Sequence, residues 1–401
     1  MRYFVIVMLL VLLLGGCMSP KYYTSKGVSY FQQPVKELDN CFKFTNPITT
    51  EQATVSVPIA GNPVSANEKI YFPVETSYLV DKQMHAYTTV YAVDAVTNAV
   101  TDSLVLKDRG IKETYRHVVF NNDIYLVGTR DSLLYIYKTD GSLDIINQYS
   151  LNINLLYIAY AAMYDGRLRI VGTEPNKDIV MYELKTDTMQ PERKRLLLKN
   201  FDAYDADGNN LWYFSAGDTT LSTARIDISA YDPNPVYKSF NISIPEMSGY
   251  RAYHAKAAGE KLYISYSWFT DDAKGASKLI SINYADGKIL SKEVVGNISF
   301  DVITANGKTY IFRTAMLKKK QAFTVAELTP ELAEVNPAAT FFMADYESVK
   351  SIVPYKDNKF FLTGMYQQKT GKKIEEEIPG MPKMKMDEMI PQPFFAIIDL
   401  Q

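Results

Sequence analysis

The sequence is poor in the side chains that carry most catalytic and metal chemistry. It has three histidines, His85, His117 and His254, and none stands in a metal-ligand spacing such as His-Glu-x-x-His. It has no Gly-x-Ser-x-Gly elbow and no glycine-rich phosphate loop. Glycosidases need only two carboxylates, so an enzyme is not excluded, but no carboxylate pair stands out. We therefore expect a non-enzymatic protein, and we assign no catalytic residue, cofactor or metal.

An excess of charge of either sign is also missing. The 43 basic and 45 acidic residues leave a formal net charge of −2, which excludes the basic surplus that nucleic-acid binding requires. No segment keeps a helical period over a dozen residues. The 30 tyrosines, by contrast, suit half-buried strands. The composition therefore favours β structure and indicates no nucleic-acid partner.

Residues 1–16 have the features of a secretory signal peptide. Arg2 precedes an apolar run over residues 4–14, which is shorter than the roughly 20 residues of a transmembrane helix. The run ends in Leu14-Gly15-Gly16-Cys17, which resembles the lipobox of bacterial lipoproteins. The resemblance implies that Cys17 becomes the N-terminal residue and carries acyl chains such as palmitate, which anchor the protein to a membrane. The alternative is an ordinary signal peptide with a chance cysteine.

The residues after the lipobox bear on location and on stability. Met18 stands where the lipoprotein sorting rule puts an aspartate for inner-membrane retention, so the resemblance implies the outer membrane of the cell envelope. It leaves open whether the body faces the periplasm or the outside. With Cys17 acylated, Cys41 is the only cysteine left, so no intramolecular disulfide can form. We expect stability to come from a large core.

A pattern repeats about every fifty residues along the rest of the chain. A turn of Gly, Asn or Asp leads into a short strand, and the position of Tyr71 recurs six more times. The seven positions are Tyr71, Tyr125, Arg169, Trp212, Tyr263, Tyr310 and Phe361. Each copy continues with further period-2 runs separated by turns such as Asp140-Gly141, which is typical of hairpins. The pattern predicts an all-β propeller of seven four-stranded blades, with six to eight as the range.

The chain ends support this architecture. The last copy holds only three predicted strands, near residues 351–355, 359–366 and 393–400, whereas residues 54–59 form a strand without a unit of its own. Because Pro58 suits a sheet edge, we expect this N-terminal strand to close the last blade. The predicted organisation is a signal peptide at 1–16, a lipidated tether at 17–50 and a propeller at 51–401.

Two strand-and-turn segments resemble the broad class of quinoprotein-like, WD-like propellers. They are residues 90–98, Val-Tyr-Ala-Val-Asp-Ala-Val-Thr-Asn, and residues 279–287, Leu-Ile-Ser-Ile-Asn-Tyr-Ala-Asp-Gly. Together with the lipobox, this arrangement is similar to the propeller lipoprotein of the outer-membrane β-barrel assembly machinery. The resemblance implies a lipid-anchored scaffold with an envelope protein as its partner.

The first strand of each blade borders the mouth of the central channel, the best concave surface of a propeller. Arginine there could clamp a carboxylate or phosphate, and tyrosine could stack on a sugar or peptide. The candidate ligand-binding residues are Tyr115, Arg116, His117, Tyr160, Asp202, Tyr250, Arg251, His254 and Asp301. The alternative is that these side chains form a hydrogen-bonded channel lining.

The longest departure from the repeat is the hairpin tip of the last blade, residues 368–392. Its methionines could form a docking arm for a partner, because thioether side chains adapt to partner surfaces. They are Met381, Met384, Met386 and Met389. The alternatives are a featureless loop and a Cu(I) site. The basic runs at residues 193–195 and 318–320 suggest solvated charges on outer strands or hairpin tips.

These observations favour a lipid-anchored envelope propeller that acts as a protein-interaction or ligand-binding scaffold. The alternative function is a saccharide- or peptide-binding protein, or an enzyme, that uses the channel mouth. Partner identity and oligomeric state do not follow from the sequence.

Overall fold

The computed structural model describes residues 36–37, 41–43, 56–60 and, with gaps, 64–399. The gaps in the last range are residues 67, 81–82, 95, 98, 107–111, 131, 218, 243–250, 270–274, 295–298, 306, 318–319, 336–338, 343–346, 357–358 and 377–383. Residues 1–35, with the expected signal peptide and Cys17, lie outside the described residues, and so do Tyr250 and Met381. Among the residues described, no helix is long and apolar enough to cross a bilayer.

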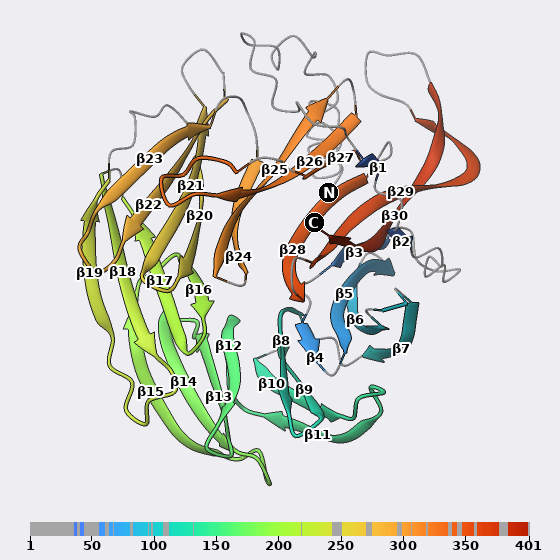
Figure 1. Cartoon of the computed structure of the whole chain (residues 1–401). Coiled ribbons are helices and arrows are strands. Elements are labelled where there is room, and N and C mark those ends of the chain that lie inside the picture. The colour runs from blue at the N-terminus through green and yellow to red at the C-terminus, as the bar shows by residue number, and fades with distance from the viewer. Residues whose placement is uncertain are drawn as a thin grey trace. The chain divides into compact units, whose positions relative to one another are not determined.

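Strands are the only regular elements in the described part of the chain, and they form seven sheets (Figure 1). Each sheet is built on four antiparallel strands, which is the make-up of a propeller blade. The protein is therefore a seven-bladed β-propeller, and the predicted fold class is confirmed. We number the blades 1 to 7 in chain order.

The chain divides into two compact units, of which residues 38–243 and 346–401 form one. This unit holds blades 1 to 4 and blade 7. Blade 1 consists of β3 (Ser56–Ala60), β4 (Val64–Ala66), β5 (Lys69–Val80), β6 (Gln83–Asp94) and β7 (Ala99–Leu106), and blade 2 consists of β8 (Lys112–Phe120), β9 (Asp123–Arg130), β10 (Leu133–Thr139) and β11 (Ile145–Leu151). Blade 3 consists of β12 (Tyr157–Tyr164), β13 (Arg167–Thr173), β14 (Asp178–Lys185) and β15 (Pro191–Lys199), and blade 4 consists of β16 (Ala203–Asp207), β17 (Asn210–Ala216), β18 (Thr220–Asp227) and β19 (Val236–Asn241). Blade 7 consists of β28 (Glu347–Lys356), β29 (Lys359–Glu376), β30 (Met384–Asp399) and β2 (Cys41–Lys43).

Residues 1–37 and 244–345 form the second unit, which holds blades 5 and 6. Its strands are β20 (Arg251–Ala258), β21 (Lys261–Phe269), β22 (Gly275–Asn283) and β23 (Ile289–Val294) in blade 5, and β24 (Ser299–Ala305), β25 (Lys308–Leu317), β26 (Lys320–Leu328) and β27 (Ala339–Phe342) in blade 6. The two-residue strand β1 (Lys36–Glu37) pairs in parallel with β27.

The seven repeated positions all lie near the start of the second strand of a blade, and all seven side chains are buried. In two blades this side chain reaches a turn of the next blade. The Tyr71 hydroxyl donates to the carbonyl oxygen of Gly141 over 3.1 Å. Arg169, which replaces the aromatic residue in blade 3, donates from Nη1 to the carbonyls of Ile228 and Ala230 over 2.6 and 3.0 Å. The repeat therefore marks both the core of each blade and the bonds between neighbouring blades.

The expectation that residues 54–59 complete the last blade is wrong in the strand it names. Residues 56–60 form β3, which pairs with β5 in blade 1, with Pro58 opposite Thr76. The strand that pairs with the outer edge of β30 is instead β2, through Cys41, Phe42 and Lys43. β3 and β5 are separated by few residues, so their pairing closes a much shorter loop than pairing with β30 would. Pro58 still lies on a strand at the edge of its sheet.

Candidate functional site

The first strands of blades 2, 3 and 4 bring several predicted site residues together. β12 contacts both β8 and β16. Arg116 lies on β8, Tyr160 lies on β12, and Asp202 directly precedes β16. Tyr115 and His117 are also on β8, but their side chains are not among those described. We call the side chains of these three strands the first-strand cluster.

Arg116 is held in this cluster by groups of the two neighbouring blades. Its Nε donates to the carbonyl oxygen of Ala159 in blade 3 over 3.2 Å, and its Nη2 donates to the hydroxyl of Tyr204 in blade 4. The guanidinium carbon lies 5.9 Å from the centroid of the Tyr204 ring. The arginine thus joins three blades. This arrangement is the one expected if these side chains form a hydrogen-bonded lining rather than a ligand-binding site.

Tyrosines of β12 and β16 also belong to the first-strand cluster. The rings of Tyr157 and Tyr204 are stacked with centroids 5.7 Å apart. The hydroxyls of Tyr160 and Tyr164 are 3.0 Å apart, and Tyr164 donates to Oδ1 of Asn209 over 3.0 Å. Burial, followed by the hydrogen bond with Tyr164, raises the pKa of Tyr160, so this phenol stays neutral at physiological pH. The described part of the cluster therefore combines tyrosine hydroxyls and the guanidinium of Arg116 with the carboxylates of Asp205 and Asp207 on β16.

Tyr213 adds a polar group that lacks a partner. It lies on β17, its side chain is buried, and its hydroxyl makes no hydrogen bond. Burial raises the pKa of this phenol well above its ordinary value, with smaller contributions from Tyr157 and Tyr204. Because a buried hydroxyl without a partner costs free energy, this position suits an ordered water or a polar group of a ligand.

The carboxylate of Asp202 is exposed at the end of this cluster. Its Oδ2 accepts a hydrogen bond of 2.8 Å from Oγ of Ser215. Within the described ranges, no group of three or more histidine, cysteine, aspartate or glutamate side chains is placed to hold a metal ion.

Three further predicted residues belong to the other unit, which holds blades 5 and 6. Arg251 and His254 lie on β20, and Asp301 lies on β24. The side chain of His254 is exposed, and those of Arg251 and Asp301 are not described. These residues therefore lie on first strands, as predicted, but they are not part of the first-strand cluster.

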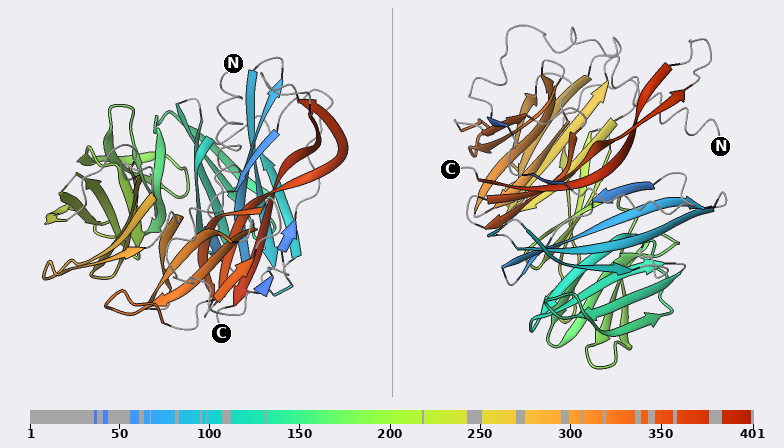
Figure 2. Two further views of the ribbon diagram at one scale, coloured as in Figure 1. Left: turned by 90° about the horizontal axis from the view of Figure 1, so that it is seen from above. Right: turned by 90° about the vertical axis from the view of Figure 1, so that its right-hand side faces the viewer.

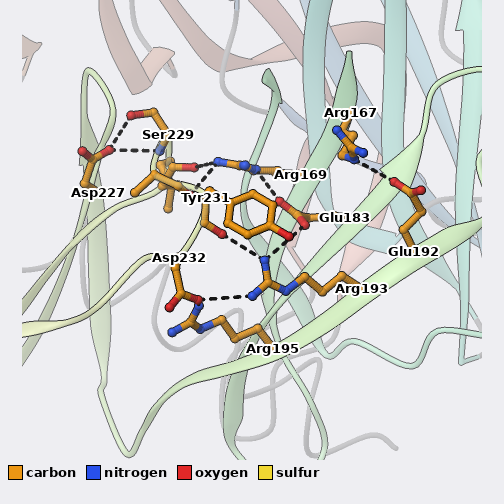
Figure 3. Close-up of polar contacts among 12 residues, drawn as sticks. Arg167, Arg169, Glu183, Glu192, Arg193, Arg195, Asp227, Ser229, Tyr231 and Asp232 are labelled. Atoms are coloured by element: carbon orange, nitrogen blue, oxygen red, sulfur yellow. Dashed lines mark hydrogen bonds and ion pairs between the residues drawn. The ribbon is translucent and has the colours of Figure 1, made fainter. Parts of the chain in front are cut away.

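A charged network that the sequence did not reveal joins blades 3 and 4 (Figure 3). At its centre, Nε of the buried Arg169 donates to the buried carboxylate of Glu183 over 2.8 Å. The guanidinium of Arg169 also lies 5.3 Å from the ring centroid of Tyr164. The signal available in the sequence was an arginine at a position that is aromatic in the six other repeats.

Two arginines of the basic run at residues 193–195 extend this network. Arg193 donates to the carbonyl oxygen of Tyr231 over 3.0 Å and to the carboxylate of Asp232 over 3.2 Å (Figure 3). Arg195 pairs with Asp232 and donates to Oδ1 of Asn234 over 3.3 Å. The run lies on an outer strand, as predicted, but the interpretation as solvated edge charge is wrong for these two arginines because they bond the next blade.

The predicted methionine arm is a two-stranded β-ribbon. In the part of the chain that the structure describes, β28 pairs with β29 only as far as Tyr366, and β2 pairs with β30 only at residues 394–396. Beyond these points the two long strands continue together (Figure 2). Residues 367–376 and 384–391, which we call the ribbon, pair within the described residues only with each other. β3 of blade 1 contacts both β29 and β30.

The register of the ribbon separates its residues onto two faces, because directly opposite residues of an antiparallel pair share a face. Met386 is opposite Ile374, whereas Asp387 is opposite Lys373. Asp387 forms ion pairs with Lys373 and, over 3.3 Å, with Lys369. Alternation along β30 puts Met389 on the face of Asp387 and both Met384 and Met386 on the other face.

Comparison with known proteins adds no family. No family model matches the chain, and no curated protein matches it. One solved structure with a similar fold is the β-propeller domain of the trilobed protease from Pyrococcus furiosus, with a TM-score of 0.45 and 8% identity over 78% of this chain and 90% of that chain. Another is the WD40 domain of SCAP from fission yeast, with a TM-score of 0.42 and 9% identity over 87% and 95% of the two chains.

Proposed function

We propose that the protein is a lipid-anchored scaffold of the bacterial envelope that docks protein partners through its propeller. The observation that carries this proposal is the ribbon, which continues past the described residues of the other strands of blade 7. A blade does not need such an extension, and an isolated two-stranded ribbon is only marginally stable in water. A role in docking a partner would explain the presence of the ribbon, since propellers serve many proteins as interaction platforms.

The chemistry of the first-strand cluster also supports a scaffold over a clamp for a small anion. Arg116, the strongest candidate clamp, already donates to Ala159 and Tyr204. These two bonds leave a carboxylate or phosphate only the remaining N–H groups of the guanidinium. Arg116 is therefore better suited to holding three blades in place.

The test is capture of partners from native membranes after crosslinking in the intact cell. The matched variant joins Lys369 to Met389, which are directly opposite each other, by an Asn-Gly turn and so removes the outer part of the ribbon. We expect a partner that the full chain captures and the shortened chain does not, with the same thermal midpoint for both. Equal capture by both chains would exclude the ribbon as the docking element, and no capture by either would overturn the scaffold.

The anchor is tested separately at Cys17. We expect Cys17→Ser to abolish incorporation of labelled palmitate and to move the protein from the membrane fraction to the soluble fraction, because the acyl chains supply the membrane affinity. A body that stays membrane-bound without palmitate would show that a different surface holds it there.

A second candidate function, binding of a saccharide or a peptide at the first-strand cluster, is favoured by one observation. The Tyr213 hydroxyl is buried without a hydrogen-bond partner beside the stacked rings of Tyr157 and Tyr204. Calorimetric titration with chitotriose and with a tetra-alanine peptide tests this function. Binding that Tyr204→Ala removes would establish it, and an absence of heat with both probes would count against it.

A further inference from the structure

The outer strands of the blades differ in how their free edges are protected. An outer strand leaves a row of backbone N–H and C=O groups unpaired, and charged residues on the strand discourage other chains from pairing there. Four outer strands carry such charges. They are β7 with Asp102, β15 with Lys194 and Lys199, β19 with Lys238, and β23 with Lys292 and Glu293.

Two outer edges without charge are covered by short strands from the N-terminal part of this chain. β27, Ala-Thr-Phe-Phe, is paired by β1. The uncharged segment 394–396 of β30 is paired by β2. Each covering strand is only two or three residues long and brings charge to the edge through Lys36 and Glu37 or through Lys43. The chain thus shows that these edges accept isolated extended segments.

β11 is the exception to both kinds of protection. Its sequence, Ile-Ile-Asn-Gln-Tyr-Ser-Leu, contains no charged residue, no proline and no glycine. It is the last strand of blade 2, and among the residues described no strand pairs with its outer edge. Ile145 and Ile146 are 38% and 49% exposed, and Asn147 is exposed as well. A seven-residue segment of this composition at a sheet edge has the features that favour pairing with another strand.

We propose that the outer edge of β11 is a docking site for an extended, uncharged segment of a protein partner, which adds to blade 2 as a fifth strand. Backbone hydrogen bonds to the edge supply the affinity, and β-branched or aromatic side chains of the partner pack beside Ile145 and Ile146. An uncharged segment fits because β11 offers no charge to pair with one on the partner. This inference rests on the proposed scaffold function and adds to it a surface distinct from the ribbon.

The size of the site favours a segment over a second copy of this chain. A stable interface between two folded proteins buries about 800 Å² on each partner, more than one seven-residue edge strand provides. An extended segment needs no second surface, as β1 and β2 show in this protein. A symmetric β11–β11 pair is accordingly an outcome of the test that would overturn the proposal.

The test places a photoreactive amino acid at Ile146 and, as a matched control, at the exposed Ser239 on the charged outer strand β19, in protein produced in its own bacterium. We expect a product from position 146 only, with the attachment point inside an uncharged extended segment of another protein. Asn147→Lys should lower its yield about tenfold by adding a charge to the edge, with an unchanged thermal midpoint.

Three results would overturn the proposal: no product from position 146, equal products from positions 146 and 239, or a product of two copies of this chain. The outcome is separable from that of the ribbon experiment. If the scaffold function is correct but this site is not, the full-length ribbon still captures a partner while position 146 yields nothing. If the scaffold function itself fails, neither experiment gives a partner.

Discussion

At the scale of single residues, Gly172 on β13 lies close to Tyr157 and Leu155. A Cβ added there would lie 2.7 Å from the carbonyl oxygen of Tyr157 and 2.8 Å from Cδ1 of Leu155. Because the first of these is backbone, it cannot move aside cheaply. We expect Gly172→Ala to lower the free energy of unfolding by about 1–3 kcal/mol, measured by urea denaturation. Gly217→Ala, whose Cβ would be 3.5 Å from its nearest neighbour, is the control and should have little effect.

The buried pair Arg169–Glu183 leads to a second prediction at this scale. Both side chains are at most 4% exposed, so removal of either partner leaves a buried charge without its counter-charge. We expect Glu183→Leu to destabilise the protein by roughly 3–5 kcal/mol, and the double variant with Arg169→Met to cost less than the two single changes together. A double-mutant cycle in urea measures the coupling. Additive costs would mean that Arg169 acts mainly through the carbonyls of Ile228 and Ala230.

At the scale of elements, the ribbon contains a pH-dependent contact at Asp387. Hydrogen bonds from Lys373 and then from Lys369 lower the pKa of this carboxyl below its ordinary value of 3.8. A lowered pKa means that the contact contributes fully above the ordinary value and is lost as the pH falls through the lowered one. We expect hydrogen-exchange protection of the ribbon to fall below a pH of about 4 and, at neutral pH, in Asp387→Asn. Unchanged protection in this variant would show that backbone pairing alone orders the ribbon.

The outer edge of β30 gives another prediction for an element. Pro391 is opposite Gln367 and Pro393 is opposite Met365, and neither proline nitrogen carries a hydrogen. A proline within a sheet sits where its nitrogen faces away from the pairing strand, so these two residues remove donors from the edge next to the segment that β2 covers. Replacing both by threonine should produce concentration-dependent association in light scattering. Pro330→Thr in an exposed turn is the control and should remain unassociated.

The elements also show how far the sequence could lead. The spacing of the repeat predicted all seven second strands, because each needs a turn followed by a buried side chain such as Tyr71 or Phe361. It could not predict the role of Arg169, since the spacing specifies burial but not the bonds that a polar side chain finds in the next blade. It also could not assign β3, because an edge strand with alternating apolar residues fits several edges equally well. The positions of the first strands in the repeat predicted that Arg116, Tyr160 and Asp202 belong to one region. The hydrogen bond from Arg116 to Tyr204 could not be predicted, because it depends on three blades folding together.

At the scale of the whole molecule, the strands that cover the uncharged edges of blades 6 and 7 come from the start of the chain. Deletion of residues 36–43 removes β1 and β2 and uncovers β27 and residues 394–396. Two effects should follow: a lower thermal midpoint, by roughly 1–2 °C for each kcal/mol lost, and association through the exposed edges. Deletion of residues 20–27 removes the same number of residues and is the control. Equal midpoints for the two deletions would show that blades 6 and 7 are complete without their covering strands. A lower midpoint for the first deletion alone would mean that residues 36–43 are part of the fold, whereas residues 20–27 can be removed without destabilising it.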